Sequence, residues 1–114
     1  MSDAELGPED LKIITLARST RARVTSAEGA AVRDETGRTY AAAAVALPSL
    51  QLSALRLAVA MAVSSGASAL EAAALVTEAD QPDPGDLAAV RDLGPGAPVF
   101  LAAPDGAVRA TLNP

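Results

Sequence analysis

Two aspartates, a serine and an arginine are the residues of this chain whose types and spacing could do chemistry. Asp83 and Asp86 lie three residues apart in a Pro-Asp-Pro-Gly-Asp stretch. Ser53 and Arg56 have the same spacing, and Arg56 is the lone charge in the apolar segment 50–66. Carboxylate pairs can bind a metal ion or transfer protons, and a serine is a nucleophile when a base lies beside it. These four residues are therefore the candidates to test against simpler structural roles.

The groups that would complete such sites are missing from the sequence. There is no cysteine and no histidine, which removes thiolate ligands, the commonest metal ligand and the usual base of a serine nucleophile. The single lysine, Lys12, falls in the first expected helix. Asp83 before Pro84 is a good helix N-cap, and Asp86 is an acid in the first helical turn. We favour these structural roles over metal ligation and expect no cofactor.

The composition limits the classes of function. With 114 residues the chain is one domain, half of it hydrophobic, with Tyr40 and Phe100 as its only aromatic residues. Glycoside hydrolysis by two carboxylates would need more aromatic residues for sugar stacking. A net charge of −5 and a pI near 4.5 argue against nucleic-acid binding. No apolar run is long enough to span a membrane, and the acidic N-terminus is no signal peptide, so we expect a cytoplasmic protein. A mean hydropathy of +0.25 is high for a small domain and indicates apolar surface covered by a partner chain.

The pattern of apolar residues and turn formers predicts eight elements in the order α-β-β-α-β-α-β-β. A first helix begins at Pro8, after a mobile tail at 1–7, and one domain spans 8–112. Strands are expected at 28–35, 39–47, 72–77, 99–103 and 108–112, and a helix at 84–93. Gly37 supplies the left-handed residue of a hairpin turn between the first two strands. A hairpin followed by strands joined through helices predicts a mixed five-stranded sheet in an α/β fold with helices on both faces.

The segment 50–66 is expected to form a central helix with Ser49 as its N-cap and Gly66 as its C′ residue. Apolar residues occur around nearly its whole circumference, which predicts burial on nearly all sides. Leu52, Leu57 and Met61 exceed what packing on one sheet requires. We therefore expect these three residues to form a subunit interface of a homo-oligomer, either a dimer or a tetramer.

Several short stretches resemble, in their order and spacing, motifs of the cytidine deaminase family across residues 11–108. They are Gly29-Ala30-Ala31, which resembles the Gly-Ala-Ala of the first strand; Gly37 and Tyr40, which resemble its hairpin; Ser53-Ala54-Leu55-Arg56, which resembles Cys-Ala-Glu-Arg; Pro82-Asp83-Pro84-Gly85-Asp86, which resembles Pro-Cys-Gly-x-Cys; and 99–106, which resembles the fourth strand and its Asp-Gly turn. The resemblance implies a three-layer α-β-α fold.

The same resemblance argues against the family's activity. It implies zinc ligands at the positions of Ser53, Asp83 and Asp86, and a proton-transferring glutamate at the position of Leu55. The sugar-binding Asn-x-Glu falls on the apolar residues 44–46. In the family the arginine at the position of Arg56 lies near the zinc thiolates. We therefore hypothesise that an ion-pair cluster of Arg56 with Asp83 and Asp86 has replaced the metal site.

The favoured function is a non-catalytic, oligomeric binding module related to cytidine deaminase. Its partner would be a protein or, in the vestigial pocket, a small nucleoside-like molecule. Two alternatives stay open at this point. One is a cytidine deaminase-type hydrolase with a metal held by Asp83 and Asp86, and the other is a purely structural oligomer.

Overall fold

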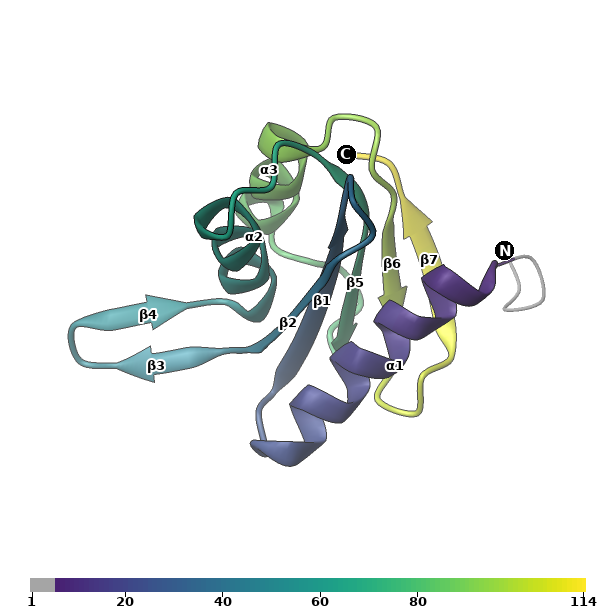
Figure 1. Ribbon diagram of the computed structural model, residues 1–114. Coiled ribbons are helices and arrows are strands. Elements are labelled where there is room, and N and C mark those ends of the chain that lie inside the picture. Colours follow the sequence, from purple (N-terminus) through teal and green to yellow (C-terminus); the bar gives the residue numbers. More distant parts are fainter. Residues whose placement is uncertain (1–5) are drawn as a thin grey trace.

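The computed structural model describes residues 6–114, and they form three layers (Figure 1). A five-stranded sheet in the order β2-β1-β5-β6-β7 lies in the middle. The helix α1 (Pro8–Arg23) covers one face, while α2 (Ala54–Ser64) and α3 (Pro84–Leu93) cover the other. The α/β class, the mixed five-stranded sheet and the helices on both faces, all expected from the sequence, are confirmed.

The sheet is mixed because only one of its strand pairs is parallel. The pair β5–β6 is parallel and is joined through α3, whereas the pairs β1–β2, β1–β5 and β6–β7 are antiparallel. The strand bounds are β1 (Glu28–Asp34), β2 (Thr39–Ala43), β5 (Leu70–Thr77), β6 (Val99–Ala102) and β7 (Val108–Leu112). The β1–β2 turn contains Gly37 at φ 87°, the left-handed conformation predicted for it.

The backbone of α1 lies very close to the face of the sheet that it covers. A β-carbon on Gly29 would overlap the carbonyl oxygen of Ala17 and lie 2.8 Å from Cβ of Arg21. Glycine is therefore required in β1 for the helix backbone to approach the sheet. The buried residues of this layer are Leu6, Ile13, Ile14, Ala17, Ala31, Ala72, Ala74, Val76, Phe100 and Ala102. Most of these are small, since five are alanines and one is a valine.

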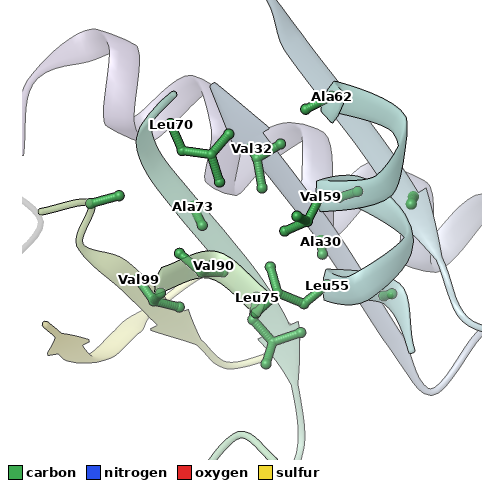
Figure 2. Close-up of a cluster of buried hydrophobic side chains, with 14 of the residues drawn as sticks. Ala30, Val32, Leu55, Val59, Ala62, Leu70, Ala73, Leu75, Val90 and Val99 are labelled. Atoms are coloured by element: carbon green, nitrogen blue, oxygen red, sulfur yellow. The ribbon is translucent and has the colours of Figure 1, made fainter. Parts of the chain in front are cut away.

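The opposite face holds the larger apolar cluster (Figure 2). Leu55 and Val59 of α2 point toward Val32 of β1 and Leu75 of β5, and Val90 of α3 completes the contact. Leu55, Leu75 and Val90 are completely buried. This layer orients the first turns of α2 and α3, where the candidate site residues lie.

The central helix is shorter than the sequence predicted. It begins at Ala54 with Ser53 as its N-cap, so the prediction of a start at Leu50 with Ser49 as the cap is wrong. Its C-terminal prediction is confirmed: Gly66 follows the last turn at φ 97°. Burial on nearly all sides is also wrong for a single chain, because Val63 is 53% exposed. The helix has one buried and one exposed apolar face.

The residues between β2 and α2 form a separate two-stranded ribbon, β3 (Val45–Leu47) with β4 (Leu50–Leu52), which we call the arm. The expected strand 39–47 is therefore broken at Ala44, where the chain leaves the main sheet. Pro48 and Ser49 form the turn between β3 and β4. The arm projects from the three-layer body (Figure 1).

The N-terminal boundary differs slightly from the expected tail at 1–7. Leu6 is only 9% exposed and packs in the α1 layer, so it is not part of a tail. Residues 1–5 lie outside the described residues. Among residues 6–114, no helix has the length and apolar character needed to span a bilayer.

Candidate functional site

The candidate site lies where α2 and α3 begin, side by side over one end of the sheet. Ser53 is the N-cap of α2, and its Oγ accepts a hydrogen bond from the backbone N–H of Arg56 at 3.2 Å. Asp83 is the N-cap of α3 and accepts from the N–H of Gly85 at 3.2 Å, as predicted. The two helix N-termini therefore bring Ser53 and Asp83 into one neighbourhood.

Asp86 is the buried centre of this neighbourhood, with only 3% of its side chain exposed. Its Oδ1 accepts a hydrogen bond from Oγ of Ser53 at 2.8 Å and lies 3.0 Å from Nε of Arg56. Nη2 of Arg56 also lies 3.6 Å from Oδ2 of Asp83. The structure thus brings together Ser53, Arg56, Asp83 and Asp86, which come from two segments about 30 residues apart in the sequence.

Gly85 makes room for the arginine. A β-carbon at this position would overlap Nη2 of Arg56 and lie 3.1 Å from its Cζ. The guanidinium therefore lies against the backbone of the first turn of α3. Arg56 is half exposed, with 47% of its side chain accessible, so the charge it brings to Asp86 is partly hydrated.

Leu55, at the position where the resemblance implies a proton-transferring glutamate, does not face this polar group. Its side chain is completely buried in the apolar cluster between α2 and the sheet, near Leu75 (Figure 2). A leucine has no group that can donate or accept a proton. Residue 55 therefore cannot transfer a proton to or from the polar cluster.

Glu28, which the sequence analysis did not single out, belongs to the same neighbourhood. Burial raises its pKa, and the negative charges of Asp86 and Asp83 raise it further, against a hydrogen bond with Thr77. Glu28 and Thr77 are cross-strand partners at the end of the β1–β5 pair. The one signal in the sequence was an acidic residue directly before Gly29-Ala30-Ala31 in an apolar strand.

The three residues expected at a subunit interface do not share one element. Leu52 is in the arm, at the end of β4, and is partly buried. Leu57 and Met61 lie on α2 and line a shallow hollow of about 360 Å³, together with Tyr40, Ala60, Ser64 and Ser65. The prediction that Leu52 lies on the central helix is wrong, because the helix begins at Ala54.

Comparisons with known proteins agree with this architecture. The sequence profile of the cytidine deaminase-like family matches residues 6–106, and the chain therefore belongs to this family. No curated protein sequence matches the chain.

Two solved structures share the fold over nearly the whole chain. Cytidine deaminase from Burkholderia pseudomallei has 24% identity and a TM-score of 0.78, covering 90% of both chains. Cytidine deaminase from Mycobacterium leprae has 20% identity and a TM-score of 0.69, covering 93% of this chain and 94% of the other. At these identities the likeness concerns the fold alone.

The residues present do not fit the zinc ion that the family implies. Zinc sites use mainly cysteine sulfur and histidine nitrogen, and the chain contains neither residue. Within residues 6–114, no group of three or more acidic side chains is arranged to hold a metal. The Oδ1 atom of Asp86 is already in contact with Ser53 and Arg56. The arrangement is a hydrogen-bonded ion-pair network and offers no metal coordination shell.

Proposed function

We propose that this chain is a catalytically inactive member of the cytidine deaminase-like family that acts as an oligomeric binding module. The observation that carries the proposal is the side chain at position 55. The resemblance implies a proton-transferring glutamate there, and this chain has a leucine that is completely buried in the core. Without a proton-transferring group at position 55, the hydrolytic step lacks the general acid and base that the resemblance implies there.

The ion-pair network supports the same conclusion. In the proposal, Arg56 and Asp86 replace the metal as the link between the first turns of α2 and α3. The contact at 3.0 Å joins the two helices without a cofactor, and the hydroxyl of Ser53 supplies a second partner to the buried carboxylate. A buried carboxylate needs such partners because an isolated buried charge is costly.

The partner surface of the proposed module is its uncharged apolar side. Leu57 and Met61 remain partly exposed on α2, and Leu47 and Leu50 are about half exposed on the arm. Such a surface suits another copy of the chain or a protein partner. A nucleoside-like ligand at the start of α2 and α3, and a cytoplasmic location, are further parts of the proposal.

The experiment that tests inactivity combines metal analysis with an assay. Elemental mass spectrometry on tag-free protein purified with added zinc should find much less than one zinc per chain. Incubation of the same sample with cytidine should produce no uridine above the buffer control. Stoichiometric metal together with turnover that Asp83→Ala abolishes would favour the alternative, a hydrolase with a metal held by carboxylates, and would overturn the proposal.

A separate experiment tests binding. Thermal shift and calorimetry with cytidine and uridine report on the nucleoside-like ligand. Light scattering on the purified chain reports on self-association, and we expect a mass of at least twice 11.4 kDa. The binding-module proposal would be contradicted if the chain is a monomer, binds no protein partner and binds neither nucleoside.

A further inference from the structure

The arm has one face made only of aliphatic side chains. In its register Val45 is opposite Leu52, and Leu47 is opposite Leu50. Side chains alternate along a strand, and directly opposed residues point to the same side of an antiparallel pair. These four residues therefore share one face, while Ala46 and Gln51 share the other.

The outer half of this apolar face is uncovered in a single chain. Leu47 is 54% exposed and Leu50 is 49% exposed, and both lie next to the turn at the end of the arm. The arm projects away from the sheet and its helices (Figure 1). A lone two-stranded ribbon is at best marginally stable in water. The arm therefore gains stability when a second surface covers its apolar face.

A surface of matching character lies on α2 of the same chain. The hollow beside Tyr40, Leu57 and Met61 is lined by apolar and hydroxyl side chains and by no charged residue. Residues 39–55, which include the whole arm, are likewise uncharged, in a chain in which 20% of the residues are charged. Neither surface contains a charged residue, so the two can pack together without burying a charge.

The dimensions of the two surfaces agree. The eleven residues of α2 extend over about 16 Å at 1.5 Å per residue. The arm extends about 13–16 Å from Ala44 to the turn at Pro48, at roughly 3.3 Å per residue. The arm joins α2 at its N-terminal end, whereas the hollow includes Ser64 and Ser65 at the C-terminal end. An antiparallel pairing of two copies would lay each arm along the partner's α2.

We propose that the arm of one copy packs its Val45, Leu47, Leu50 and Leu52 face on α2 of a second copy, and that a two-fold axis relates the two. A second copy is the occupant that the geometry favours, because one closed, symmetric contact covers both arms and both hollows. A different protein would have to supply one uncharged surface for the arm and another for the hollow. The inference rests on the proposed self-association and specifies its interface.

The first test uses two charge substitutions on opposite faces of the arm. The double variant Leu47→Asp/Leu50→Asp places charge on the apolar face, and its matched control, Gln51→Asp, places charge on the other. By sedimentation, the wild-type protein and the control should have at least twice the 11.4 kDa of one chain. The double variant should have half the wild-type mass or less, with unchanged circular dichroism to show that it folds.

The second test does not depend on disruptive variants. The natural chain has no cysteine, so single cysteines can be introduced without side reactions. A tagged Leu50→Cys chain and an untagged Ala60→Cys chain should form a tagged–untagged disulfide dimer under mild oxidation. A Val24→Cys chain, exposed at the end of α1, should not form such a dimer with Ala60→Cys.

The outcomes separate this inference from the proposed function. If the wild-type protein self-associates but the double variant keeps its mass and the Leu50–Ala60 crosslink is absent, the arm inference is overturned and the oligomer stands. If the wild-type protein is a monomer at all concentrations, both are overturned. If the chain is a monomer and its arm binds a different protein, the proposal that a second copy covers the arm is likewise contradicted.

Discussion

The guanidinium of Arg56 joins the first turns of α2 and α3, because its Nε lies 3.0 Å from Oδ1 of Asp86. The two partners differ in their environment: 47% of the arginine side chain is exposed, against 3% of the aspartate. The arginine can therefore be removed without leaving a hole, but the aspartate then keeps only Ser53 as a side-chain partner among the residues that the structure describes.

We expect Arg56→Met to reduce the free energy of unfolding at pH 7 by about 1–3 kcal/mol, because it deprives a buried carboxylate of a charged partner. Urea denaturation of Arg56→Met, of Asp86→Asn and of the double variant that combines them measures the coupling between the two residues. The control Arg91→Met, on an exposed residue of α3, should stay within about 0.5 kcal/mol of the wild type. Additive effects of the two substitutions would contradict the pairing.

Gly85→Ala should weaken the same contact from the other side. In the first turn of a helix, alanine is normally no worse than glycine, but here its β-carbon would displace the guanidinium of Arg56. We expect a loss of stability in the wild-type background and a smaller loss, or a gain, in the Arg56→Met background. Equal effects in the two backgrounds would show that Gly85 does not position the arginine. Urea denaturation is again the measurement.

Glu28→Gln should stabilise the protein at neutral pH. Burial and the nearby aspartates raise the pKa of Glu28 above 4.5, so the folded state binds this proton more tightly than the unfolded state. The resulting stability is fully present below pH 4.5 and is lost as the pH rises through the folded-state pKa. The variant should therefore match the wild type near pH 4 and exceed it at pH 7. Glu78→Gln, an exposed neighbour of Thr77, should give no such gain.

Asp34→Asn should destabilise the β1–β2 turn in a pH-dependent way. Hydrogen bonds from the hydroxyl of Thr36, and then from Tyr40 and two backbone N–H groups, lower the pKa of Asp34 from 3.8 to about 2, against the opposing effect of burial. The carboxylate therefore stabilises the fold above pH 3.8, and this contribution is lost as the pH falls to about 2. The difference between variant and wild type, measured by chemical denaturation, should be largest at pH 6–7 and should decrease as the pH falls through about 2. A constant difference would rule out the carboxylate as its source.

Cysteines at the positions that the resemblance equates with the family's zinc ligands should create a zinc site. We expect the variant Ser53→Cys/Asp83→Cys/Asp86→Cys to bind about one zinc per chain by elemental mass spectrometry, because two helix N-termini stabilise thiolates and the three side chains lie together. The matched variant Ser53→Cys/Asp80→Cys/Asp86→Cys, with one ligand moved to the exposed loop, should bind zinc at least tenfold more weakly. Equal zinc content in both would contradict the equivalence of these positions with a metal site.

Much of the fold could be predicted because its signals are local. Gly37 and Gly66 have the left-handed conformations that their turns require, and Asp83 with Pro84 begins α3 as predicted. The arm was missed for an equally physical reason. The residues around Pro48 are uncharged and tolerate either helix or strand, and both Ser49 and Ser53 are suitable N-caps. The choice between Ser49 and Ser53 as the N-cap depends on where the chain leaves the main sheet, which is the end of β2 at Ala43.

The candidate site divides along the same line. The sequence by itself determined that the chain has no cysteine and no histidine and that residue 55 is a leucine. It also determined the cap of α3, because Asp83 and Pro84 are neighbours in the sequence, whereas the cap of α2 was predicted at Ser49 and lies at Ser53. Only the tertiary structure decided that Arg56 reaches Asp86 and that the charge of Asp86 raises the pKa of Glu28, because these interactions require β1 to pair with β5 and α3 to dock next to α2. Such long-range packing depends on the whole core, and no short stretch of sequence encodes it.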